Sequence, residues 1–423
     1  MKFFSKISLF FRQAFQFGQP ARLFLLATII DGTIYSAWSL FFNFFILARG
    51  YDQSFLGVVN AAPSFAALVL GIPLGLLSDR MGRRRAMLLG LAIYSLGALG
   101  QLLAPDRGLL LLASLAAGAG NTLYYLSQAP FMMKASTPQN RAMLFSLNFG
   151  LITLAGALGS ILAGSLPPVL ATALQVAEKH VSVYQTILFG AVAIGSLSLV
   201  PIFLIREPAE HQPGDSAPQP EKQFILKVLL RPVVLKLFIP NVLIGLGAAI
   251  LIPYQNIFFD GRFGTSAGML GFLFSISAVL TGVGSVIGPL LEELFGGKIR
   301  TVVITQAGSL FFLLLMGFSP YFSLAVVGFL VRAMLMNMAS PLYTAFSMEQ
   351  IEPHDQGAVN SLLNISWTAG WAVGPMISGV VQERWGFTPL FIATAGLYGL
   401  AILLSWWFFV RRPAVRVGPG EQA

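Results

Sequence analysis

The sequence predicts an all-α membrane protein with twelve transmembrane helices in two six-helix halves. The chain has 423 residues, of which 56% are hydrophobic and only 10% are charged, against about 25% charged residues in soluble proteins. Apolar stretches of span length recur from end to end, and each is long enough to cross the roughly 30 Å hydrocarbon core of a bilayer. A segment rich in proline and charge interrupts them once, near the middle of the chain.

The apolar stretches favour helices over a β-barrel because they are continuous rather than alternating. A bilayer offers no water to satisfy backbone groups, so each span must satisfy its own by forming a helix. We expect the spans at 21–47, 55–78, 86–104, 108–133, 142–166, 182–205, 237–259, 267–291, 301–318, 321–348, 357–381 and 388–410.

The positive charges predict the orientation of these spans. If both termini are cytoplasmic, the cytoplasmic segments hold 20 of the 26 Lys and Arg residues, and the opposite loops hold five. This is the positive-inside bias of membrane proteins. The net charge of +9 is therefore a topology signal, and it gives no basic soluble face for nucleic acid.

The segment after the sixth span divides the chain into two halves. Residues 206–223 read REPAEHQPGDSAPQPEKQ, the composition of a flexible linker. We expect an amphipathic N-terminal segment at 1–20, a first half at 21–205, a cytoplasmic linker at 206–236, a second half at 237–410 and a cytoplasmic tail at 411–423. The halves repeat weakly, since three small residues recur 215 positions apart: Ser146 and Ser361, Gly159 and Gly374, and Gly164 and Gly379.

Several kinds of chemistry find no support in the sequence. The chain has no cysteine, and its three histidines lie far apart in predicted loops, so we expect no metal site and no cofactor. There is no phosphate-binding loop of the ATPase type and no catalytic constellation. We therefore do not expect an enzyme.

The loop between the second and third spans carries a motif. Residues 75–85 read GLLSDRMGRRR. This loop resembles the signature loop of the major facilitator superfamily, which reads glycine, any residue, leucine, small residue, aspartate, arginine, any residue, glycine, arginine, basic residue. The matching positions are Gly75, Leu77, Ser78, Asp79, Arg80, Gly82, Arg83 and Arg84.

The resemblance implies the fold of that superfamily, two pseudo-symmetric six-helix bundles that work by alternating access. It also implies that Asp79 meets the inner end of the eleventh span and holds the halves together there, because an acid is stabilised at a helix N-terminus. A tight turn with a positive-inside cluster is the alternative. We assign gating to Gly75, Asp79, Arg80, Gly82, Arg83 and Arg84, and to Glu292, which stands at the corresponding position of the second half.

Only Asp31 and Arg332 lie well within predicted spans, both near the membrane midplane. A charge there costs roughly 2.5–3.5 kcal/mol on insertion scales, so it usually faces a cavity or a partner. The resemblance places both on helices that line the central cavity. We expect Asp31 to bind a proton or a cationic group, with Arg332 as its counter-charge or as an anion site. A static ion pair between the halves is the alternative.

Polar and aromatic stripes accompany these charges on the expected cavity helices, with hydrogen bonding between helices as their alternative role. The candidate substrate contacts are Tyr35, Trp38, Asn121, Tyr125, Gln128, Tyr254, Gln255, Asn256, Met336, Tyr343, Trp367 and Trp371. Ser114 stands where many antiporters of the superfamily carry an arginine.

We predict a secondary active transporter, with proton-coupled export of amphipathic compounds as the leading function. One alternative is an uptake or exchange carrier for an organic acid, whose carboxylate Arg332 binds. The other is a membrane sensor or lipid-handling protein that transports no solute. The expected partners are a small-molecule substrate, protons and the lipid bilayer, with no nucleic acid. We expect a monomer in the bacterial inner membrane with both termini in the cytoplasm.

Overall fold

The computed structural model describes residues 17–206, 228–352 and 354–411. Within these ranges the regular secondary structure is helical, and no strand is present. Most of the expected N-terminal amphipathic segment, most of the linker and the tail beyond residue 411 lie outside the described residues.

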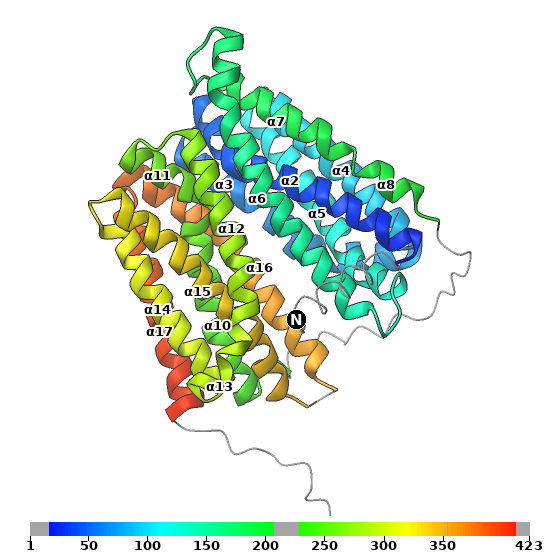
Figure 1. The fold of residues 1–423 in the computed structure, drawn as a ribbon, viewed down its shortest axis with the longest axis vertical. Coiled ribbons are helices and arrows are strands. Elements are labelled where there is room, and N and C mark those ends of the chain that lie inside the picture. The colour runs from blue at the N-terminus through cyan, green and yellow to red at the C-terminus, as the bar shows by residue number, and fades with distance from the viewer. Residues whose placement is uncertain (1–16, 207–227, 353, 412–423) are drawn as a thin grey trace, which may run out of the picture. The chain divides into compact units, whose positions relative to one another are not determined.

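The first six expected spans are each formed by a long helix or by two consecutive helices (Figure 1). They are α2 (Gln19–Ala48), α3 (Gln53–Met81), α4 (Arg83–Leu103), α5 (Arg107–Lys134), α6 (Arg141–Leu174), and α7 (Val181–Ser196) followed by α8 (Leu199–Leu204).

The second six are built in the same way, with a short helix after the eighth span. They are α10 (Pro232–Leu251), η1 (Ile252–Tyr254) and α11 (Gln255–Phe263), α12 (Ala267–Leu290), α13 (Glu292–Phe295), α14 (Lys298–Phe318), α15 (Phe322–Glu349), α16 (Gln356–Trp385), and α17 (Thr388–Ser405) followed by η2 (Trp406–Arg411).

Eleven helical stretches among the described residues are long and apolar enough to cross a membrane. The remaining expected span, the eleventh, coincides with α16. This helix has 30 residues and is long enough to cross. It carries Asn360, Asn364 and several glycines, which lower its mean hydropathy.

Two of the departures from the sequence-based expectations involve proline. The fifth span was expected to end at 166, but α6 continues through Pro167 and Pro168 to Leu174, because the residues after the prolines are apolar and favour helix. The seventh span was expected to be continuous, but it changes to a 3₁₀ turn at Ile252–Tyr254. Pro253 explains the change, because proline lacks the N–H that an α-helix needs.

The last span ends in a different kind of helix. Residues Trp406–Arg411 form a π-helical turn that continues α17. The Arg411 guanidinium lies 5.8 Å from the ring centre of Trp406 and 4.5 Å from that of Trp407. A cation over an aromatic face is held by the ring quadrupole.

The chain groups by its contacts into two compact units. Unit 1 combines the first six spans with Ile252–Val279 and Trp371–Arg384, and unit 2 contains Pro220–Leu251, Leu280–Gly370 and Trp385–Ala423. Within unit 1, α4 packs along α5 and α2 packs along α6. Within unit 2, α14 packs along α15 and α10 packs along α17. The helices α12 and α16 each contribute residues to both units.

Candidate functional site

The predicted proton or cation site, Asp31, lies on α2 within unit 1, among four tyrosines. Tyr35, Tyr94, Tyr124 and Tyr125 all lie close enough to interact with its charge. We name these five residues the Asp31 cluster. Asp31 forms no ion pair with any residue that the structure describes.

The Asp31 cluster draws its side chains from three helices. Asp31 and Tyr35 are one turn apart on α2, Tyr94 comes from α4, and Tyr124 and Tyr125 are adjacent on α5. Tyr124 is 2% exposed, whereas Tyr35 and Tyr125 are 60% and 40% exposed. The two α5 rings meet edge to face with centres 5.6 Å apart. The cluster therefore combines one carboxylate with aromatic faces and hydroxyl groups.

Sequence reasoning identified Asp31, Tyr35 and Tyr125 but missed Tyr94 and Tyr124. The third span was not expected to line the cavity, so Tyr94 gave no signal. Tyr124 is next to Tyr125 and lies off the polar stripe Asn121, Tyr125, Gln128 that helical spacing gives for α5.

An asparagine network joins three helices of unit 1. The Asn43 side-chain amide donates to the main-chain oxygen of Pro253 at 2.6 Å and to the side-chain oxygen of Asn256 at 3.1 Å. Asn60 on α3 donates to the Asn43 side-chain oxygen at 3.0 Å, and Asn256 donates to the main-chain oxygen of Leu40 at 2.8 Å. These bonds tie α2 and α3 to the break in the seventh span.

The predicted contacts of the seventh span lie inside unit 1. The Tyr254 hydroxyl donates to the main-chain oxygen of Pro375 at 2.9 Å, and the ring is 1% exposed. Gln255 and Asn256 are also buried. These placements favour packing and hydrogen bonding between helices for Tyr254 and Asn256; substrate contact by the three residues stays a prediction.

The other predicted contacts of unit 1 have varied surroundings. Trp38 stacks on Phe42 with ring centres 4.8 Å apart. Gln128 is buried beside Tyr124, while Asn121 and Trp371 are half-buried.

Arg332, the other predicted charge, lies on α15 within unit 2 and is 5% exposed. Its Nε atom is buried and has no hydrogen-bond partner, and no carboxylate of the described residues forms an ion pair with it. Tyr398 on α17 lies near its charge. A buried guanidinium without a counter-ion is costly, so this position suits an anionic group. The expected pairing of Arg332 with Asp31 stays a prediction.

The remaining predicted contacts lie in unit 2. The Tyr343 hydroxyl donates to the main-chain oxygen of Leu237, which links α15 to α10. Trp367 is 41% exposed and packs beside Gly245 of α10, where an added Cβ would lie 3.3 Å from its ring. Met336 is half-buried on α15.

The signature loop forms a tight connection between α3 and α4. Gly82 has a φ of 89°, which favours glycine. Asp79 forms an ion pair with Arg83, and Arg83 also donates to the Ser78 hydroxyl at 2.8 Å.

The other loop residues differ in their contacts. Arg84 donates to the main-chain oxygens of Ile202 and Phe203. Arg80 is exposed, and a Cβ on Gly75 would meet open space. In unit 2, Glu292 lies 4.0 Å from the Lys298 amine, which also pairs with Glu349.

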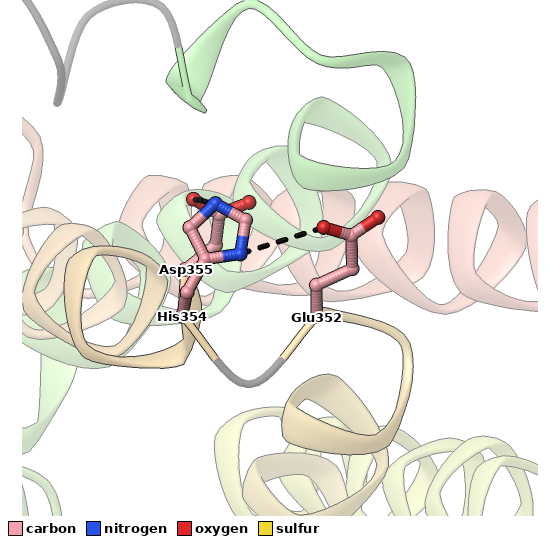
Figure 2. Close-up of side chains that lie close together, drawn as sticks. All are labelled: Glu352, His354 and Asp355. Carbon is pink, nitrogen blue, oxygen red and sulfur yellow. Dashed lines mark ion pairs between the residues drawn. The ribbon is translucent and has the colours of Figure 1, made fainter. Parts of the chain in front are cut away.

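Two acidic residues and a histidine lie close together just before α16 in unit 2 (Figure 2). His354 places Nδ1 at 3.4 Å from a Glu352 carboxylate oxygen and Nε2 at 3.1 Å from Asp355 Oδ1. The second oxygen of Asp355, a fully buried side chain, pairs with Arg231. Arg231 is thus the charged partner of the Asp355 carboxylate, whose Oδ1 atom is buried without a hydrogen-bond partner among the described residues.

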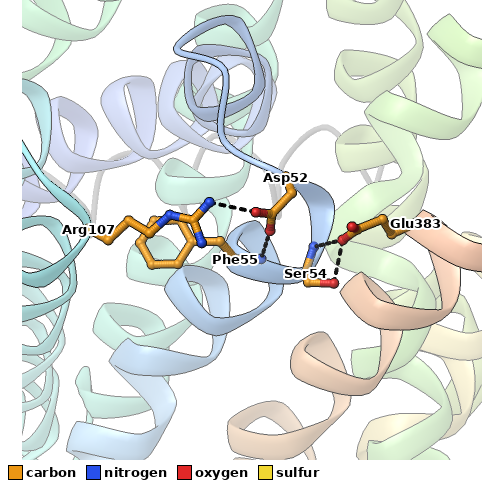
Figure 3. Close-up of polar contacts among 5 residues, drawn as sticks. All are labelled: Asp52, Ser54, Phe55, Arg107 and Glu383. Carbon is orange, nitrogen blue, oxygen red and sulfur yellow. Dashed lines mark hydrogen bonds and ion pairs between the residues drawn. The ribbon is translucent and has the colours of Figure 1, made fainter.

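A polar group lies at the opposite end of α3, which we call the Asp52 end of unit 1 (Figure 3). Asp52 precedes α3, and its Oδ1 accepts a hydrogen bond from the Phe55 amide at 2.6 Å. Its Oδ2 accepts from Arg107 at 2.7 Å, and the Arg107 guanidinium lies 5.0 Å from the Phe55 ring centre. The Phe55 amide, followed by Arg107, lowers the pKa of the Asp52 carboxyl below its ordinary value.

A groove of about 530 Å³ lies between α4 and α5. Its lining is almost wholly apolar and includes Leu96, Gly97, Leu109 and Ala113. It shares no residue with the Asp31 cluster.

Comparisons with known proteins agree with this architecture. The family model of the Major Facilitator Superfamily matches residues 23–259 and 237–423. The chain is 23% identical over 370 residues to the uncharacterized MFS-type transporter YhhS of Escherichia coli K12, with 86% of each chain covered. Its match to YhhS of Salmonella enteritidis spans only 40% of that protein, at 24% identity over 40% of this chain.

Two further similarities differ in their extent. A putative sugar efflux transporter of Deinococcus radiodurans is 28% identical over 43% of this chain and 47% of its own length. The crystal structure of the nucleoside transporter NupG superposes with a TM-score of 0.71 at 15% identity, covering 92% of this chain and 98% of that one. That likeness shows the shared fold.

The family match covers most of the chain, and the structure supplies the long apolar helices that the family requires. The expected multi-pass membrane protein with the all-α fold is therefore confirmed. The chain belongs to the major facilitator superfamily.

Proposed function

We propose that this protein exports amphipathic compounds in exchange for protons, with the Asp31 cluster as the coupling site. The observation that carries the proposal is a carboxylate within a span, with no ion-pair partner among the described residues and four tyrosines around it. A carboxylate in such a place needs a proton or a cation to offset its desolvation.

A proton and a cationic substrate compete for the Asp31 carboxylate, and this competition is the basis of the proposed exchange. Burial favours the protonated carboxyl group, whereas a cation bound beside it favours the ionised form. A cationic amphipathic substrate would therefore displace the proton, and a returning proton would displace the substrate. The tyrosine faces suit an organic cation because the ring quadrupole attracts positive charge.

The proposed cycle is alternating access between two sides of the membrane. The charge bias in the sequence supports both termini in the cytoplasm, with the signature loop inside and the Asp52 end outside. Gating by the signature loop, including Asp79, belongs to this proposal.

The test is transport into and out of proteoliposomes under an imposed pH gradient. A fluorescent amphipathic cation should move against its own gradient when protons move the other way, and Asp31→Asn should abolish this movement. Glu178→Gln is the matched control, because it removes an exposed loop carboxylate. Normal, equally pH-dependent transport by Asp31→Asn would show that the coupling proposal is wrong.

Arg332 supports a second candidate, a carrier for organic acids. A buried guanidinium without a carboxylate partner among the described residues is suited to a bidentate substrate carboxylate. On this alternative, Arg332→Lys loses organic-acid binding while Asp31→Asn retains exchange. Absence of any flux with cations, organic acids and sugars would favour a non-transporting sensor or lipid-handling protein instead.

A further inference from the structure

A carboxylate from the end of α16 binds the first turn of α3 in unit 1 (Figure 3). One Glu383 oxygen, Oε2, accepts a hydrogen bond from the Ser54 amide at 3.0 Å and another from the Ser54 hydroxyl. The two residues are 329 positions apart in the chain. Asp52 accepts a hydrogen bond from the Phe55 amide of the same turn. Two carboxylates therefore satisfy amide groups that a helix N-terminus leaves without intrahelical partners.

The backbones of the two helices approach closely beside this contact. A Cβ atom on Gly57 of α3 would lie 2.5 Å from the main-chain oxygen of Pro375 and 3.2 Å from the Cα of Gly379. Gly379 and Glu383 are one turn apart on α16, and Ser54 and Gly57 are one turn apart on α3, so each pair shares a face. The glycines permit the approach, and Glu383 occupies the position from which it reaches the helix end.

A second crossing of the same kind lies within unit 1. A Cβ on Gly164 of α6 would lie 2.8 Å from the main-chain oxygen of Ala267, at the start of α12. Both crossings join a first-half helix to a second-half helix. Both contacts must loosen if Ile252–Val279 and Trp371–Arg384, the second-half segments of unit 1, move away from the first-half helices.

The Glu383 contact is the counterpart of the one that the sequence suggested for Asp79. The second and eleventh spans run in opposite directions in the expected topology, so the amino end of α3 and the carboxyl end of α16 belong to the same membrane face. Asp79 lies near the end of α3, and the sequence suggested that it contacts the first turn of α16. Glu383 lies near the end of α16, and it accepts a hydrogen bond from the first turn of α3. In the structure Asp79 pairs with Arg83.

We propose that Glu383 is a gating residue, a carboxylate that holds the Asp52 end of unit 1 closed and releases Ser54 when that end opens. This rests on the alternating-access part of the proposed function. A negative charge at a helix N-terminus is stabilised by the free amide groups and the helix dipole. Because Glu383 is exposed, water can replace Ser54, so the contact is weak enough to break in every cycle.

The test measures whether a buried position behind the crossing becomes reachable. Ala61 lies one turn beyond Gly57 on α3 and is 2% exposed. The chain has no cysteine, so Ala61→Cys is a reporter without background. Protein in lipid nanodiscs would be treated with a maleimide, and the labelling rate compared between the Ala61→Cys protein and the same protein carrying Glu383→Ala. We expect labelling to become about threefold to tenfold faster.

Two controls separate gating from general loosening. Ala98→Cys reports from a buried position of α4, a helix that takes part in neither crossing, is 3% exposed, and should label at an unchanged rate. Glu178→Gln should leave Ala61→Cys labelling unchanged. Should Glu383→Ala fail to give monodisperse protein, Glu383→Gln replaces it, since it keeps the side-chain size and loses the charge; we then expect a smaller increase in the same direction.

The outcomes decide the proposal. Unchanged labelling of Ala61→Cys, or an equal rise at Ala98→Cys, would overturn it. The assay uses no substrate and no proton gradient, so its result is independent of coupling by Asp31. Normal transport by Asp31→Asn together with faster Ala61→Cys labelling in Glu383→Ala would reject the coupling proposal and keep the gating residue.

Discussion

The Asn43 side chain donates a hydrogen bond to the Asn256 side chain at 3.1 Å, across 213 residues of sequence. Asn43 also binds Pro253, at the point where the seventh span changes from α-helix to a 3₁₀ turn. The polar side chain therefore offsets the backbone disruption that proline causes. A break in a transmembrane helix is tolerated only where neighbouring groups satisfy the freed backbone atoms.

Asn43→Ala should destabilise the protein, because the Pro253 oxygen loses a donor and Asn256 and Asn60 lose a side-chain partner. We expect a loss of about 1 kcal/mol, within the range measured for hydrogen bonds in membranes. The measurement is thermal unfolding in detergent. Asn364→Ala is the control, because Asn364 is exposed and, among the described residues, its side chain bonds within its own helix; an equal loss in both variants would contradict the prediction.

Gly57→Ala should disturb the crossing of α3 with α16. The added methyl group would lie 2.5 Å from the Pro375 oxygen, which is backbone and cannot swing away. We expect a loss of about 1–3 kcal/mol, the usual cost of overpacking. Gly71→Ala is the matched control on the same helix, since its Cβ would meet nothing within 4 Å, and it should leave the midpoint of thermal unfolding unchanged or raise it.

Asp52 predicts a specific dependence of stability on pH. The Phe55 amide and then Arg107 lower its pKa in the folded protein. The stabilisation that Asp52 gives the folded protein is therefore fully present above the ordinary aspartate pKa of about 3.9. It is lost as the pH falls through the lower pKa that Asp52 has in the folded protein. Asp52→Asn should be less stable than the parent at pH 7, with a difference that shrinks below about pH 4. A difference that is constant from pH 7 to pH 3 would contradict this.

Arg332→Met should raise the thermal stability of the protein or leave it unchanged. The substitution replaces a buried guanidinium, without an ion-pair partner among the described residues, by an apolar side chain of similar length. Thermal unfolding in detergent, with Arg332→Lys as the charged control, measures the effect. A marked loss of stability in Arg332→Met alone would reveal a counter-ion for Arg332 and would favour the static ion pair.

The sequence was sufficient for the fold class and the family. Apolar runs of span length and the signature loop predicted the multi-pass helical architecture, because helix formation in a bilayer depends on local composition. Helix interruptions were harder to predict. Pro253 breaks the seventh span, where Asn43 donates to its main-chain oxygen, whereas Pro167 and Pro168 do not end α6.

The candidate site was predictable only in part. A charge within an apolar span stands out in one sequence, so Asp31 and Arg332 could be identified. The tyrosines around Asp31 could not all be found, since Tyr94 reaches it from the third span and Tyr124 lies off the polar stripe of its helix. Glu383 gave no signal either, because its partner Ser54 is 329 residues away.

The π-helical end of α17 has a consequence for how deeply this protein sits in the bilayer. Tryptophan and arginine prefer the level of the lipid headgroups, and Trp406, Trp407 and Arg411 are gathered within one turn. The turn acts as a depth marker for the final span. Membranes of different thickness should therefore be accommodated by tilting or by deforming the lipid around this helix rather than by sliding it along the membrane normal.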